Sequence, residues 1–66
     1  MKIVLNHVPS EISNALKTNT VYLNKNGVIT ECKGILYNET IIKMVPTIYG
    51  HGILLAPEDE VYYIAE

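Results

Sequence analysis

The stretch VYLNKNGVITEC, residues 21–32, is the part of the sequence that decides the fold. At its centre stands Asn26-Gly27, the residue pair that two-residue type I′ hairpin turns prefer. A turn here makes the flanking residues two antiparallel strands with these opposite partners: Lys25 and Val28, Leu23 and Thr30, Val21 and Cys32. The other face of the hairpin carries Tyr22, Asn24, Ile29 and Glu31. Such a division is typical of a small antiparallel sheet with one face in water.

The residues before this hairpin predict one strand and one short helix. Residues 2–6, KIVLN, read as a first strand, which Pro9 breaks. Ser10 is expected to cap the following helix, because a serine hydroxyl can accept a hydrogen bond from the free N–H groups of the first turn. The apolar stripe of this helix consists of Ile12, Ala15 and Leu16. Residues 18–20 end the helix after about two turns, and so short a helix must pack on a sheet to be stable.

The residues after the hairpin predict two more turns. Gly34 suggests a bulge or bend, and Pro46 an edge, a bulge or a strand break, because proline cannot donate to a ladder. The second expected turn is Asn38-Glu39, with these pairs: Tyr37 and Thr40, Leu36 and Ile41, Ile35 and Ile42. The third expected turn is Gly50-His51-Gly52, with Tyr49 near Ile53 and Ile48 near Leu54. In both of these hairpins, apolar residues fall on both faces.

The C-terminal residues complete the expected fold. Residues 57–60 suit either a turn or the first turn of a helix, and the segment VYYIA, residues 61–65, favours a strand. We therefore expect a single α+β domain over residues 1–66, rich in β structure. One short N-terminal helix would pack on an antiparallel meander of about five strands, with a partial barrel as one form the sheet can take.

The overall composition disfavours several classes of partner. The chain carries a formal charge of −2 and no arginine, so its five lysines make a poor nucleic-acid surface. No apolar run is long enough for a signal-peptide core or a membrane helix, so we expect a cytoplasmic protein without membrane contact. The abundance of isoleucine, asparagine, lysine and tyrosine reflects AT-rich codons and suggests an AT-rich microbial or phage genome, with a phage or another mobile element as one source.

The segment Ile41 to Ala56, IIKMVPTIYGHGILLA, points to association with another chain. Ten of its sixteen residues are apolar or tyrosine, which is hard to bury in the core of so small a domain. Small proteins often add disulfides or a metal, but Cys32 is the only cysteine. The possible soft ligands, His7, Cys32 and His51, show no metal-binding spacing. We therefore expect a homodimer or higher oligomer, with no cofactor and no metal.

Catalysis is the activity that the sequence supports least. Serine, cysteine, histidine and carboxylate residues are all present, but no spacing unites them as nucleophile and base. Cys32 falls on the expected buried face, where a cysteine is inert. A monomer of this size also has little room for a cleft that excludes water. We expect a protein that is not an enzyme.

The candidate contact residues are Tyr49, His51, Glu58, Asp59, Glu60 and Tyr62. Glycines on both sides of His51 would let its backbone approach a partner closely, although a loop tip that merely faces water has the same pattern. The three acids could dock a basic surface, or form an ordinary solvated loop. Tyrosine combines an apolar ring with a hydroxyl that tolerates water, so it suits an interface and the rim of a core equally.

These features favour a non-catalytic binding protein of the inhibitor or adaptor type, which acts as a homo-oligomer on another protein. The alternative is a protein that binds or sequesters a small ligand, with the pocket between subunits and residues 50–52 lining it. The sequence favours the first hypothesis, because an apolar excess and amphipathic tyrosines are typical of protein interfaces.

Overall fold

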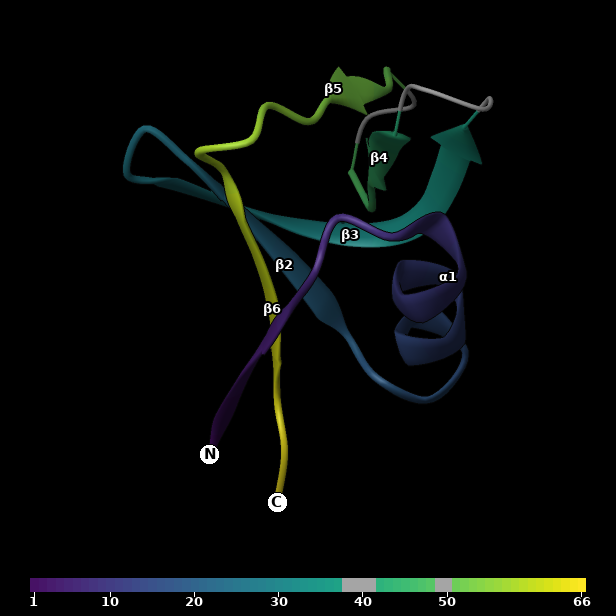
Figure 1. Ribbon diagram of the computed structural model, residues 1–66, viewed down its shortest axis with the longest axis vertical. Coiled ribbons are helices and arrows are strands. Elements are labelled where there is room, and N and C mark those ends of the chain that lie inside the picture. Colours follow the sequence, from purple (N-terminus) through teal and green to yellow (C-terminus); the bar gives the residue numbers. More distant parts are fainter. Residues whose placement is uncertain (38–41, 49–50) are drawn as a thin grey trace.

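The computed structural model describes residues 1–37, 42–48 and 51–66, without the side chains of residues 34–37. Among these residues, six strands form one antiparallel sheet in the order β1-β6-β2-β3-β4-β5, and one helix packs on it (Figure 1). The elements are β1 (Lys2–Leu5), α1 (Pro9–Thr18), β2 (Val21–Lys25), β3 (Val28–Tyr37), β4 (Ile42–Pro46), β5 (Ile53–Leu54) and β6 (Glu60–Ile64). The predicted α+β class and the excess of β structure are confirmed.

The hairpin of β2 and β3 forms as predicted. Asn26 and Gly27 have φ angles of 52° and 82°, as a type I′ turn requires at both central residues. The side-chain amide oxygen of Asn24 accepts a hydrogen bond of 3.1 Å from the Gly27 N–H. The strand pairs run from Lys25 with Val28 to Val21 with Cys32, in the predicted register.

The first and last strands depart from a simple meander. β6 lies between β1 and β2, and pairs antiparallel with both. The C-terminal segment 61–65 is therefore a strand, as its β-branched and aromatic residues predict. It is a central strand, and the sheet has six strands where about five were expected. The two termini consequently lie close together at one end of the molecule (Figure 1).

The sheet bends along β3. Its pairing with β4 shifts between Cys32 and Gly34, which confirms the predicted irregularity at this glycine. The pairs that follow are Ile35 with Met44, Leu36 with Lys43 and Tyr37 with Ile42. The predicted register, which set Ile35 opposite Ile42, is wrong by two residues because the pairing leaves four residues, 38–41, between the strands. The expected Asn38-Glu39 turn itself lies outside the described residues.

The strand β5 pairs differently from the prediction. Its two residues lie opposite β4, with Ile53 paired to Met44 and Leu54 to Lys43. The prediction that Leu54 lies near Ile48 is wrong. β4 ends at Pro46, before Ile48, and the chain pairs with β4 again only from residue 53. The expected contact of Tyr49 with Ile53, and residue Gly50, fall outside the described residues.

The helix α1 covers the inner face of the sheet and packs mainly on β3. Its residues Ile12 and Ala15 are buried, and Leu16 packs beside them. The core cluster consists of Ile12, Ala15, Val21, Leu23, Cys32, Met44 and Val61. Burial of these apolar side chains provides the main driving force for folding. The helix is too short to cross a membrane; no helix of the described residues is long and apolar enough for that.

The helix begins earlier than predicted. Its N-cap is Val8, in an extended conformation and without a side-chain hydrogen bond, and Pro9 occupies the first turn. Ser10 therefore lies inside the helix and is not its cap. Proline suits this position because its φ angle is preset for the helix, and because an N–H group here would have no partner within the helix. Pro9 therefore begins the helix, whereas β1 has already ended at Leu5.

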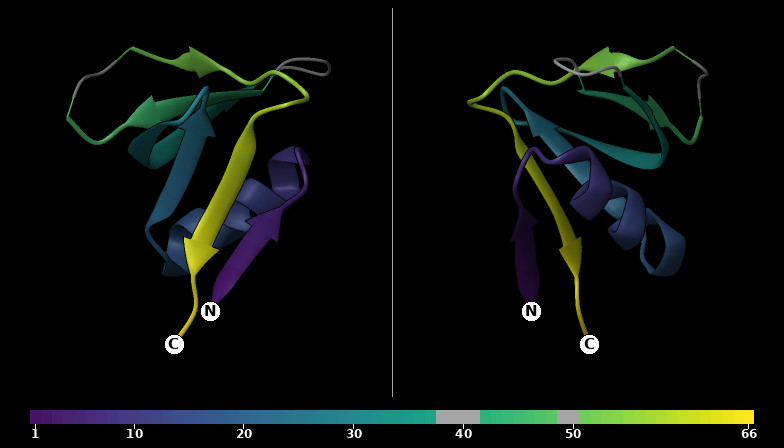
Figure 2. Two further views of the ribbon diagram at one scale, coloured as in Figure 1. Left: turned by 90° about the vertical axis from the view of Figure 1, so that its left-hand side faces the viewer. Right: turned by 45° about the vertical axis from the view of Figure 1, so that its right-hand side comes forward.

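The strands β4 and β5 lie across one end of the molecule, above the upper ends of β2 and β6 (Figure 2). The chain leaves β5 and makes a turn, in which the Asp59 N–H donates to the Ala56 carbonyl over 3.0 Å. Pro57 occupies the second position of this turn, which proline favours. The sheet is curved but open, since β1 and β5 stand at its two ends in the pairing order.

Candidate functional site

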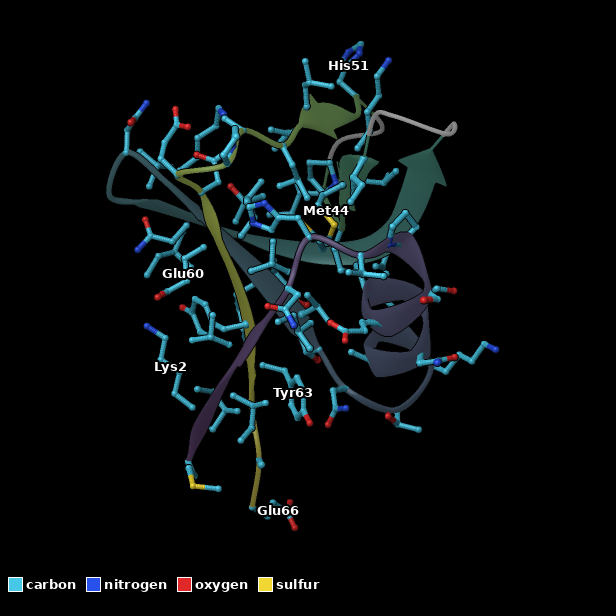
Figure 3. All side chains as sticks on the ribbon, in the orientation of Figure 1. Lys2, Met44, His51, Glu60, Tyr63 and Glu66 are labelled. Atoms are coloured by element: carbon cyan, nitrogen blue, oxygen red, sulfur yellow. The ribbon has the colours of Figure 1, made fainter. Side chains whose placement is uncertain are left out.

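Five of the six predicted contact residues lie among the described residues: on β6, in the turn before it, and in the connection before β5. His51 is exposed and its side chain extends beyond β5, away from the body of the molecule (Figure 3). Tyr49 lies outside the described residues. Glu60 and Tyr62 lie on β6, which is separated from β5 in the sheet order by β2, β3 and β4. The role of these residues in partner contact stays a prediction.

Two of the three acidic residues are held by lysines of the same chain. The Asp59 side chain is 2% exposed, and its Oδ2 atom accepts hydrogen bonds from Lys25 Nζ over 2.7 Å and from the Ala56 N–H over 2.9 Å. The hydrogen bond from Lys25, followed by that from the Ala56 N–H, lowers the pKa of Asp59. Glu60 pairs with Lys2 over 2.5 Å. Only Glu58, which is exposed, extends into solvent without such a lysine among the described residues.

Tyr62 is part of a compact group on the outer face of the sheet, opposite α1. Its ring stacks on that of Tyr22, with centroids 5.4 Å apart and planes inclined by 25°. Lys2 Nζ lies 4.6 Å from the centroid of the Tyr62 ring. Tyr62 is therefore only 9% exposed and stabilises the sheet across three strands. Lys2 and Glu60 lie together on this side of β6, whereas Tyr63 points towards α1 (Figure 3).

An apolar groove of about 400 Å³ lies between β3 and the returning chain. Its lining consists of Ile29, Thr30, Glu31, Pro46, Thr47, Ile48 and Ile53. Ile48 is 80% exposed and Ile29 is 58% exposed, so two large apolar side chains flank the groove in contact with water. Four of these residues belong to the apolar segment 41–56, from which a shared surface was predicted.

The contribution of Ile29 to this groove was missed from the sequence. The hairpin register correctly placed it on the wet face, where one exposed isoleucine needs no explanation. Ile29 and Ile48 line the same groove because residues 46–48 lie beside β3. The backbone shows this approach directly, because the Thr47 N–H donates to the Glu31 carbonyl over 3.0 Å.

Cys32 is buried beside the core residues, as the hairpin register predicted. Its Sγ donates a weak hydrogen bond to the Thr30 carbonyl over 3.6 Å. Burial, and to a smaller degree the charge of Glu31, raises the pKa of the Cys32 thiol to about 11. The thiol is therefore protonated near neutral pH and is a poor nucleophile. Across the described residues, no three side chains of histidine, cysteine, aspartate or glutamate come together as a metal site.

Comparison with family models, with curated proteins and with solved structures gives no match for this chain. The functional argument therefore depends on surfaces and side chains. Among these, the groove flanked by Ile29 and Ile48 is the feature that the stability of the monomer does not explain, because exposed apolar side chains contribute little to folding.

Proposed function

We propose that this chain is a small non-catalytic binding protein, which associates with itself and acts on another protein as an inhibitor or adaptor. The observation that carries the proposal is the apolar groove of Ile29, Pro46, Ile48 and Ile53, with two of its isoleucines largely in water. That the protein is cytoplasmic and that a phage or another mobile element encodes it stay predictions from the sequence.

Self-association through the groove would cover side chains that folding leaves exposed. Transfer of apolar surface out of water contributes about 25 cal/mol per Å², so two largely exposed isoleucines per subunit make a useful centre for an interface. A standard interface covers about 800 Å² on each partner, or about a sixth of the 4537 Å² surface of this monomer. The groove and its surroundings on β3 and β5 are of a suitable size for the centre of such a contact.

The test is the subunit number of Ile48→Glu against that of Val28→Glu, measured by native mass spectrometry and light scattering at micromolar concentration. Val28 is 66% exposed but does not line the groove, so it is the matched control. We expect a dimer or higher oligomer for wild type and Val28→Glu, and a monomer for Ile48→Glu, because a charge at the centre of an interface loses its water. A monomeric wild type, or an oligomer that Ile48→Glu leaves intact, would contradict self-association through this groove.

The alternative function, binding of a small ligand, has one observation in its favour. The groove volume of about 400 Å³ falls within the range of about 300–1,000 Å³ that is usual for small-molecule sites, and its lining is mainly apolar. The same native mass spectra decide between the two functions. A small molecule retained by wild type and lost from Ile48→Glu would favour ligand binding between subunits over a purely protein-binding role.

A further inference from the structure

The strand β1 leaves one edge of the sheet open. Within residues 1–37, 42–48 and 51–66, it pairs with β6 on one side only. The Ala65 N–H donates to the Met1 carbonyl, so Met1 and Ala65 form a hydrogen-bonded pair. Such pairs alternate along an antiparallel ladder, so Ile3 also bonds to β6, whereas the N–H and C=O groups of Lys2 and Val4 point to the open edge.

The opposite edge of the sheet is protected. β5 has two residues, and Lys25 Nζ lies 3.4 Å from the Leu54 carbonyl, where it donates a hydrogen bond. Short edge strands and lysine side chains are two devices that discourage pairing with other chains. β1 also contains a lysine, but Lys2 is drawn towards Glu60 and the Tyr62 ring over the neighbouring strand, so it does not shield the edge (Figure 3).

A polar groove of about 500 Å³ runs beside β1 on the side of the sheet that faces α1. It is lined by Val4, Leu5, Asn6, Glu11, Asn14, Ala15, Thr18, Asn19 and Tyr63. Glu11 is the one acidic side chain in this lining, which contains no lysine or histidine, and it is exposed. No ion pair of Glu11 occurs among the side chains that the structure describes. The groove is therefore electrostatically suited to a positive side chain.

We propose that β1 accepts an extended segment of another protein as an additional strand, with basic side chains in the groove opposite Glu11. The open N–H and C=O groups of Lys2 and Val4 would bind its backbone, and alternate side chains would supply specificity. The side chains that point to the other face would lie beside Val4, which is 57% exposed, so apolar residues suit those positions. The partner segment thus alternates basic and apolar residues.

A second copy of this chain fits the site poorly. If β1 paired with the β1 of another subunit, the residues on its inner face, Ile3 and Leu5, would bring apolar side chains to the polar groove. The charge of Glu11 would gain no partner from them. The inference rests on the proposal that the protein binds another protein, but it does not use the groove of Ile29 and Ile48.

The first test uses two synthetic peptides of eight residues with blocked ends, one alternating lysine and valine and the other alternating glutamate and valine. Fluorescence polarisation would measure their affinity for wild type, Glu11→Lys and the control Glu58→Lys, which alters an exposed acid outside the groove. We expect wild type and Glu58→Lys to prefer the lysine peptide, and Glu11→Lys to bind it at least about tenfold more weakly and to prefer the glutamate peptide. Equal affinity for both peptides, or no binding to wild type at millimolar peptide, would overturn the proposal.

The second test identifies strand pairing through the peptide backbone. We expect the peptide to pair antiparallel to β1, as neighbouring strands of this sheet do. Peptide residues whose N–H groups face β1 then have side chains on the same face as Lys2 and Val4, so in the lysine peptide they are the valines. N-methylation of the valines should therefore abolish binding, whereas N-methylation of the lysines should leave it within about threefold. Equal tolerance of both modifications would exclude addition to the edge. Ile48→Glu should bind the lysine peptide as wild type does, so failure of the oligomer proposal and of this one are separately visible.

Discussion

The hairpins β2–β3 and β4–β5 are built from similar residues but are specified in different ways. β2 and β3 pair over five positions around a two-residue turn with both φ angles positive. β4 and β5 pair over two positions, and residues 47–52 connect them. The first hairpin gives Val21, Leu23 and Cys32 to the core, whereas the second gives Met44 and leaves Ile48 and Leu54 exposed. The hairpin fixed by its own turn completes the core, whereas the one fixed by packing leaves apolar side chains exposed.

The largest expected effect comes from the core end of the first hairpin. Leu23→Ala removes a side chain with 0% exposure, and we expect it to cost about 2–5 kcal/mol of the free energy of unfolding. A chain of this size has about 3–10 kcal/mol in total, so this variant should be largely unfolded or close to it. Ile53→Ala, on partly exposed β5, should cost less than half as much in urea denaturation. Equal losses would break the comparison between the hairpins.

The same difference explains how far the sequence predicted the fold. The Asn26-Gly27 pair stabilises its turn through local backbone preferences, so the register of β2 and β3 could be derived from neighbouring residues. The pairing of β4 with β5 has no such local determinant. It depends on where Met44 enters the core and on where the chain returns after Pro46, which are properties of the folded whole. Likewise, β6 pairs with β1 and β2, which are far from it in the sequence, and the segment VYYIA alone does not determine these partners.

The next effect tests the turn of the first hairpin directly. Gly27 has a φ angle of 82°, which residues with a Cβ atom adopt at a cost, and an added Cβ would meet no atom within 4 Å. Gly27→Ala should therefore lower the free energy of unfolding by about 1–2 kcal/mol through backbone conformation alone. Gly27→Asn should lower it less, because asparagine tolerates this region better.

The matched change in the second hairpin is His51→Ala, at an exposed position in its connection. Urea denaturation should show a change within about 0.5 kcal/mol, because this side chain has no part in the core. A loss as large as that of Gly27→Ala would show that the connection of β4 and β5 is also fixed locally, contrary to the comparison.

The candidate site was less predictable than the fold, for reasons that particular residues show. Tyrosine is a residue type common at interfaces, but Tyr22 and Lys2 cover Tyr62 once the strands pair. Asp59 looks like part of a solvated acidic loop, but the turn after β5 buries it against Lys25. The groove of Ile29 and Ile48 joins residues that are far apart in the sequence. Composition can indicate that a chain has more apolar side chains than its core can bury. Only the packing shows which of these side chains remain exposed to solvent.

The last expected effect concerns the residue that joins the two hairpins. Lys25, at the end of β2, bonds both to Asp59 Oδ2 and to the Leu54 carbonyl of β5. The hydrogen bond from Lys25, followed by that from the Ala56 N–H, lowers the pKa of Asp59, so its ionised form is favoured in the folded state. The resulting stability is fully present above the ordinary aspartate pKa of about 3.9, and is lost as the pH falls through the lower pKa of the folded state.

Asp59→Asn should therefore lower the urea midpoint at pH 7, and the difference from wild type should shrink as the pH falls below about 3.9. Asparagine keeps an oxygen that can accept from the Ala56 N–H, so the variant removes the charge with little change of shape. Glu58→Gln, at the exposed neighbouring acid, is the control and should shift the midpoint little at any pH. A difference between wild type and Asp59→Asn that stayed constant down to pH 2 would show that the link from β2 to β5 depends on shape and not on charge. In that case the second hairpin would be held by packing alone.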